Sequence, residues 1–73
     1  MVGKIILDPE ILAGKPIIKG TRISVELILD LLASGMSIED ILQGYPHLKK
    51  NDILAAIEYA SKVLKREEIY LNA

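Results

Sequence analysis

The sequence predicts a mainly α-helical domain, a three-helix helix-turn-helix bundle preceded by a short β element. Two serines precede segments whose apolar residues recur at helical spacing, and two glycines stand where those segments end. A longer segment with the same spacing follows a Tyr-Pro pair. A first helix, a tight turn, a short second helix and a longer third helix are the layout of the helix-turn-helix domain.

The first 23 residues predict two short strands and a turn. A β-branched run at 4–7 is closed by an Asp-Pro pair, and a second run begins at Pro16 and extends through 19. Between them, 8–14 form a turn in which 10–12 make a single helical turn. Strands this short are marginal alone, so they pair as a hairpin or across a dimer, and the sequence leaves both arrangements open.

The first predicted helix runs from Val25 to about Ser34. Ser24 is a preferred N-cap residue, Glu26 lies where the helix dipole favours an acid, and Gly35 ends the helix. The apolar residues of this helix cover an arc of roughly 200°, about twice the stripe that a surface helix needs. We therefore expect one side to face the core and another to face a second subunit. The residues of the arc are Val25, Leu27, Ile28, Leu29, Leu31 and Leu32.

The second predicted helix begins after Ser37 and ends at Gly44. Asp40, three residues after the serine, completes a capping box. The Tyr45-Pro46 pair then imposes an extended step before the next helix.

The third predicted helix begins at Lys49 or Lys50 and runs to about Lys65. Residues 67–73 either extend it or form a tail that reaches a partner. Its expected inner face is Ile53, Leu54, Ile57, Ala60, Val63 and Leu64. Its expected outer face is Asn51, Ala55, Glu58, Tyr59, Lys62, Lys65 and Arg66.

Composition indicates one small domain that needs a partner. The chain has 73 residues and no cysteine, so neither a disulfide nor a thiolate metal site reinforces it. It is 51% hydrophobic, more than a lone domain of this size covers, so we expect a homodimer or burial against another protein. We assign 1–73 to a single domain, with strands and turn at 1–23, a three-helix core at 24–66 and a C-terminal tail at 67–73.

The sequence argues against a membrane protein and against an enzyme. No apolar run is long enough to span a bilayer, and no signal peptide is recognisable, so we expect a cytoplasmic protein. His47 is the lone histidine and lies in a turn, while Ser24 and Ser37 are explained as caps. Asp40 and Asp52 are explained as first-turn acids. We expect no catalysis, no metal, no cofactor and no small-molecule substrate.

The basic residues lie toward the two ends of the chain, although the net charge is only −1. Residues 24–44 hold four acids and no base, so any phosphate contact must come from the strands or the third helix. If that helix enters a DNA major groove, Lys50 and Asn51 are placed to reach phosphates and base edges. Ordinary solvated surface charge is the competing interpretation. The candidate DNA-binding residues are Lys15, Lys19, Arg22, Lys49, Lys50 and Asn51.

Three motifs carry a resemblance to a known family: Gly-Lys-Pro at 14–16, Gly-Thr-Arg at 20–22 and Tyr-Pro-x-Leu at 45–48. With them, the chain resembles the domain-of-unknown-function family 433, small bacterial and archaeal antitoxin-like proteins, over roughly 4–62. The resemblance implies a homeodomain-like helix-turn-helix fold with a short N-terminal β element. It also implies a PIN-like nuclease toxin encoded by a neighbouring gene. The chain departs from the family pattern at Ala13, where glycine is frequent, and at Lys49, where threonine is frequent.

Arg22 has two candidate roles. It reaches a phosphate or a toxin carboxylate, or it fixes the strand-to-helix junction by pairing with Glu26 or capping a carbonyl. We favour the junction role, because polar groups at such places commonly satisfy backbone atoms. In the same junction, Gly20 is expected to supply backbone freedom and Thr21 a local turn bond.

Two functional hypotheses follow from these patterns. The first is a dimeric antitoxin of a type II toxin–antitoxin pair, which binds a PIN-like nuclease toxin and its own operator DNA. The alternative is a dimeric protein-interaction module that has the same fold and binds no DNA, which the acidic middle of the chain favours.

Overall fold

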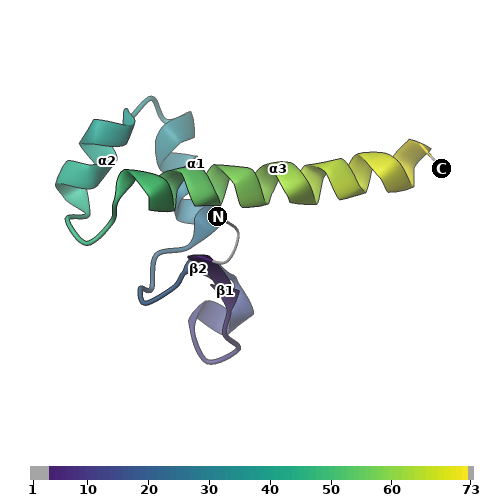
Figure 1. The fold of residues 1–73 in the computed structure, drawn as a ribbon, viewed down its shortest axis with the longest axis horizontal. Helices are drawn as coiled ribbons and strands as arrows, with labels where there is room; N and C mark the ends of the chain where they lie inside the picture. Colours follow the sequence, from purple (N-terminus) through teal and green to yellow (C-terminus); the bar gives the residue numbers. More distant parts are fainter. Residues whose placement is uncertain (1–3, 73) are drawn as a thin grey trace.

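The computed structural model describes the backbone of residues 4–72 and the side chains of residues 4–65. It has the predicted mainly helical fold, with three α-helices after a small β element (Figure 1). Helix α3 crosses the molecule lengthwise, with α1 and α2 beside its N-terminal half (Figure 1). The elements are β1 (Ile5–Leu7), the 3-10 helix η2 (Leu12–Gly14), β2 (Pro16–Ile18), α1 (Val25–Ala33), α2 (Ile38–Gly44) and α3 (Lys50–Asn72).

The two strands form an antiparallel hairpin within one chain. Ile5 pairs with Ile18 and Leu7 with Pro16, which decides between the two arrangements that the sequence left open. The turn between the strands differs from the prediction, because the helical turn lies at η2 rather than at 10–12. Leu12 and Ala13 take positive φ angles of 50° and 56° ahead of Gly14 at 81°, and this left-handed run reverses the chain.

The helix boundaries follow the predicted capping residues. The Ser24 hydroxyl accepts the Leu27 N–H at 2.9 Å, which caps the start of α1. Gly35, just beyond the last turn of α1, has a φ of 101°, in the left-handed region that favours glycine. At α2, the side chains of Ser37 and Asp40 each accept the other's backbone N–H, which confirms the capping box.

Helix α3 is longer than predicted. It begins at Lys50 and continues to Asn72, so 67–72 extend the helix. The side chains of Ile69, Tyr70 and Leu71, in the segment for which a tail that reaches a partner was the other alternative, lie outside the described residues. The second half of α3 projects past the other elements (Figure 1).

The core lies between the hairpin and the three helices. The chain folds back after β2, since the Ile18 N–H donates to the Ile23 carbonyl at 2.9 Å and Ile17 forms a bridge with Ser24. This return places the start of α1 against the hairpin. The buried cluster is Ile18, Val25, Ile28, Ile41, Leu48, Ile53 and Ala56.

The predicted inner face of α3 is wrong over most of its length. Ile53 is buried, but Leu54, Ile57, Val63 and Leu64 are exposed, at 41%, 39%, 39% and 58% of their surface. The reason is that the buried positions of α3 lie in its first two turns, where small side chains fit closely. Ala55, expected on the outer face, is buried, and so is Ala56 beside it.

The expected extra apolar face of α1 is also largely occupied. Leu29, Leu31 and Leu32 are partly buried and pack against the core cluster. Within the described part of the chain, the large exposed apolar side chains lie on β1, η2 and α3. No helix in this part combines the length and apolar character that crossing a membrane requires.

Candidate functional site

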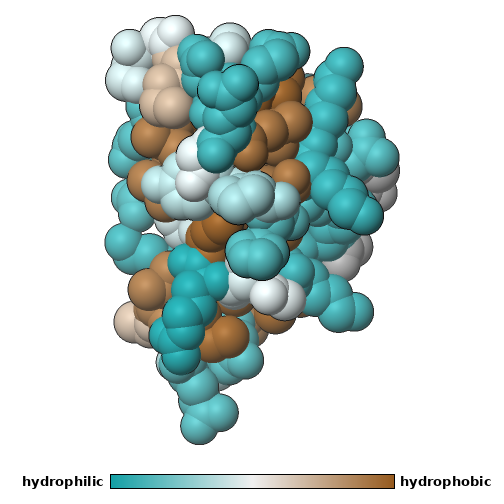
Figure 2. Space-filling view, turned by 90° about the vertical axis from the view of Figure 1, so that its left-hand side faces the viewer, coloured by the Kyte–Doolittle hydropathy of each residue, from teal (hydrophilic) through white to brown (hydrophobic). Residues whose placement is uncertain are grey.

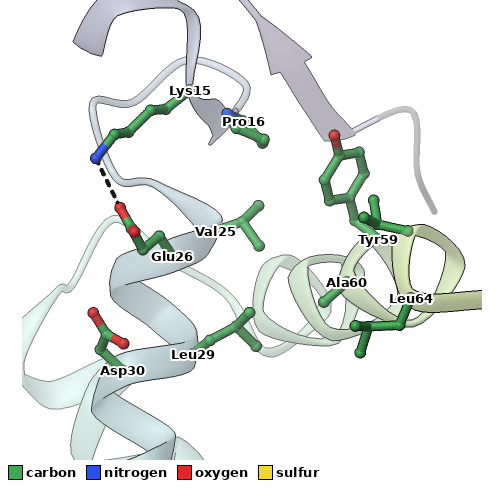
Figure 3. Close-up of a pocket in the computed structure, with 10 residues that line it drawn as sticks. Lys15, Pro16, Val25, Glu26, Leu29, Asp30, Tyr59, Ala60 and Leu64 are labelled. Carbon is green, nitrogen blue, oxygen red and sulfur yellow. Dashed lines mark hydrogen bonds and ion pairs between the residues drawn. The ribbon is translucent and has the colours of Figure 1, made fainter. Parts of the chain in front are cut away.

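An open apolar groove of about 420 Å³ lies between the hairpin, α1 and the projecting half of α3. Val25 and Leu29 point from α1 toward α3 across it (Figure 3). The groove exists because α1 meets α3 near its start, while α3 continues beyond that contact with its apolar residues uncovered. The apolar walls are Val25, Leu29, Tyr59, Ala60, Val63 and Leu64.

An ion pair closes the hairpin side of this groove. The Lys15 ammonium lies 2.8 Å from a carboxylate oxygen of Glu26, and both side chains are more than half exposed. This hydrogen bond, reinforced by the opposite charges, raises the pKa of Lys15 and lowers the pKa of Glu26. Asp30, one turn further along α1, also raises the pKa of Lys15. Lys15, predicted to bind DNA, therefore stands at the groove and is already engaged by a carboxylate.

A second hollow of about 380 Å³ lies over the neighbouring face of α3. Leu29, Ala60 and Leu64 line both hollows, so the two share a ridge. Ile57, Ser61 and Lys65 line the second hollow only. The described molecule thus presents a continuous apolar surface along α3, with Leu29 of α1 at its edge.

The first turn of α3 is tied to the hairpin through Asp52, which is buried. One carboxylate oxygen accepts the backbone N–H of Lys49 at 2.9 Å, and the other lies 3.2 Å from the Lys4 ammonium. The Lys4 carbonyl in turn accepts the Lys19 N–H at 2.7 Å. Because Asp52 accepts the Lys49 N–H, α3 starts directly after Lys49 although lysine is a poor N-cap.

From its place in the sequence, Asp52 is predicted only to be a first-turn acid, and nothing predicts its bond to Lys4. The spacing of Lys49 and Asp52 is the available local signal, since an acid at the third helical position is half of a capping box. The Lys4 contact spans 48 residues and has no such signal.

The structure brings most of the predicted DNA-binding residues to the corner where the hairpin meets α3. Lys49, Lys50 and Asn51 are exposed at the start of α3, and Lys19 is exposed beside Lys4. Figure 2 shows the end of the molecule on the left of Figure 1, where α2 and the start of α3 lie. Hydrophilic residues dominate this end, with apolar residues between them (Figure 2).

The favoured role of Arg22 is wrong. Glu26 pairs with Lys15 instead, and within residues 4–65 the exposed Arg22 side chain forms neither a hydrogen bond nor an ion pair. The junction is held by Thr21, whose hydroxyl donates to the Ile18 carbonyl at 2.8 Å and accepts the Ile23 N–H at 3.0 Å. The structure therefore places the junction's bonds in the backbone turn and in the Thr21 hydroxyl, and not in Arg22.

The described residues contain no group of three or more histidine, cysteine or acidic side chains that could hold a metal ion. His47 is exposed in the loop before α3. What the described surface does offer is apolar contact area beside α3 and positive charge around the start of that helix.

Comparison with known proteins identifies the family. The family model of DUF433, described as a protein of unknown function, matches residues 5–60. The uncharacterized protein y4eO of Sinorhizobium fredii is 38% identical over 53 residues, which are 73% of this chain and 24% of that protein. The chain therefore spans about a quarter of the length of this relative.

A solved structure has the same fold. The crystal structure of a DUF433 member from Anabaena variabilis matches with a TM-score of 0.80 and 24% identity, over 96% of this chain and 69% of that one. With the family match over residues 5–60, this likeness of fold leads to one conclusion: the chain belongs to the DUF433 family, whose function is unknown.

Proposed function

We propose that this protein is the antitoxin of a type II toxin–antitoxin pair, a cytoplasmic homodimer that binds a PIN-like nuclease toxin and is not an enzyme. The observation that supports a binding role is the open apolar groove between α1 and α3. A contiguous apolar hollow on a chain this small is typical of a surface that another protein covers. The resemblance to antitoxin-like proteins supplies the class of partner.

The chemistry of the groove defines what the toxin must present. The walls are aliphatic apart from Tyr59, so a toxin segment should insert an apolar side chain between Leu29 and Val63. On the α1 side, Lys15 compensates Glu26, whereas Asp30 forms no ion pair among the described residues. A basic residue of the toxin is therefore expected to face Asp30.

Binding to the neighbouring nuclease tests the proposal. Calorimetric titration of the purified nuclease and growth during its expression should show tight binding and rescue by the wild-type chain. Val63→Asp places a carboxylate in the groove wall and should weaken binding by about 30-fold or more, because an unpaired buried charge is costly.

Ile57→Asp is the matched control for this measurement. Ile57 and Val63 are equally exposed, at 39%, and lie on the same helix, but only Val63 lines the groove. Ile57→Asp should therefore retain toxin binding. Absence of both binding and growth rescue with the wild-type chain would reject the antitoxin role.

Operator DNA is a second candidate partner, supported by the corner that Asp52 organises. The bond between Lys4 and Asp52 draws the hairpin, with Lys19, to the start of α3, where Lys50 and Asn51 are exposed. The acids of α1 and α2 oppose this role, because each adds repulsion from phosphate. The alternative remains a dimeric protein-interaction module that binds no DNA.

A further inference from the structure

We infer that one face of α3, formed by Ile57, Ala60, Ser61 and Leu64, is a two-fold interface with a second copy of the chain. In this dimer, α3 of the second copy packs antiparallel across the midpoint between Ala60 and Ser61. The inference rests on the homodimer of the proposed function and assigns its interface, which shares Ala60 and Leu64 with the groove.

The first support is the shape of this face. Its four residues stand at positions i, i+3, i+4 and i+7, the set that forms one hole for a side chain of a facing helix. The hollow of about 380 Å³ lies over these four residues. Ala60 and Ser61 are small and stand at its centre, so the axis of a second helix can approach closely there.

The second support is that the face is complementary to itself. Ile57 and Leu64 lie equally far on either side of the midpoint between Ala60 and Ser61. A two-fold axis through that midpoint therefore places Ile57 of one copy opposite Leu64 of the other, twice over. The same surface patch on both subunits is what a two-fold interface requires.

The third support is charge. Glu58 and Lys65 are seven residues apart, so they lie on the same edge of α3 and flank this face together. In the antiparallel dimer, this edge of one α3 lies beside the same edge of the other α3, which runs in the opposite direction. Glu58 is therefore close to Lys65 of the second copy. Within the described residues, Glu58 has no ion pair.

Measurement of mass in solution tests the interface. At micromolar concentration, light scattering should return about twice the chain mass of 8.1 kDa for the wild type. Ile57→Asp should return the monomer mass, because two unpaired carboxylates in an apolar interface should weaken dimer association about 100-fold or more. Val63→Asp, equally exposed but outside this face, should remain a dimer.

A charge exchange tests the antiparallel direction. Glu58→Lys and Lys65→Glu should each weaken the dimer about two- to five-fold, since each breaks two exposed ion pairs and adds repulsion. The double variant restores both pairs with their charges reversed, so it should regain the wild-type affinity. If either residue acted only within its own chain, the double variant would not regain the wild-type dimer affinity.

Cysteine crosslinking locates the two-fold axis. The chain has no cysteine, so a single introduced thiol can form a disulfide only with the same thiol of a second copy. Ser61→Cys lies beside the axis and should form a disulfide-linked dimer in air, because the two Cα atoms then lie within about 7 Å. Lys62→Cys, the next residue, points away from the face and should remain uncrosslinked.

Each of these outcomes has an opposite that overturns the inference. The inference is wrong if the wild type has a mass of 8.1 kDa at high concentration. It is also wrong if Val63→Asp, but not Ile57→Asp, dissociates the dimer, or if a cysteine crosslinks at 62 in place of 61. Toxin binding by a monomeric wild-type chain would reject this interface and leave the antitoxin proposal standing. A dimer that fails to bind the nuclease would do the reverse.

Discussion

Asp52 shows how one side chain joins two parts of this small fold. Its carboxylate caps the first turn of α3 through the Lys49 N–H and holds the hairpin through the Lys4 ammonium. The ion pair is open to solvent on its Lys4 side, because the Lys4 side chain is 42% exposed whereas that of Asp52 is 12% exposed. The backbone bond should therefore contribute more than the ion pair, which solvent weakens.

Asp52→Ala should lower the free energy of unfolding by about 1–2 kcal/mol, because it leaves a backbone N–H of the helix start without its acceptor. Lys4→Ala should cost less than about 1 kcal/mol, as partly exposed ion pairs do. Urea unfolding of the two variants beside the wild type measures both. Equal losses would show that the ion pair, and not the cap, carries the contribution of Asp52.

At the scale of elements, the sequence predicted what depends on near neighbours. Ser24, Ser37 and Gly35 were assigned correctly because a cap involves residues within about one turn of the chain. The buried face of α3 was not, because burial there depends on where α1 meets the helix. Ala55 and Ala56 are buried where the first turns of α3 pack against the rest of the chain, and apolar spacing alone could not separate them from Ile57.

The candidate site divides in the same way. Exposure of Lys50 and Asn51 at the start of α3 was predictable from helical position. The groove was not, because its walls come from elements whose relative placement no local pattern encodes. The pairing of Lys15 with Glu26, 11 residues away, likewise depends on β2 lying beside the first turn of α1, and it left Arg22 without its expected partner.

The capping box of α2 predicts a dependence of stability on pH. Hydrogen bonds from the Ser37 backbone N–H, and then the Ser37 side chain, lower the pKa of Asp40 below its ordinary value of 3.8. A lowered pKa in the folded state means that ionised Asp40 stabilises the fold above pH 3.8 and that this contribution is lost as pH falls through the folded pKa.

Urea unfolding midpoints at several pH values between 5 and 2 check this expectation. The wild type should lose its advantage over Asp40→Asn across this window, because the variant has no carboxylate to protonate there. Glu39→Gln, at the neighbouring exposed position of the same first turn, is the control and should keep the wild-type dependence. A constant difference between wild type and Asp40→Asn would contradict the capping contribution.

For the whole molecule, the proposed dimer gives the basic corners a defined spacing. Lys50 lies 10.5 residues from the midpoint between Ala60 and Ser61, so two antiparallel copies of α3 place their starts about 32 Å apart at 1.5 Å per residue. One turn of DNA is about 34 Å. A dimer therefore presents its two sets of Lys50 and Asn51 at the spacing of successive major grooves, which a monomer with acidic α1 and α2 does not.

This spacing predicts the form of any operator. The wild type should bind its promoter at low salt through two half-sites about 10 base pairs apart, and inserting five base pairs between them should abolish binding. Lys50→Ala with Asn51→Ala should weaken binding and lower the salt slope by about 1 for each lysine removed, while leaving nuclease binding intact. Ile57→Asp should weaken DNA binding by separating the half-site readers. Failure of the wild type to bind its promoter at low salt, with nuclease binding preserved, would identify the chain as the interaction module without a DNA role.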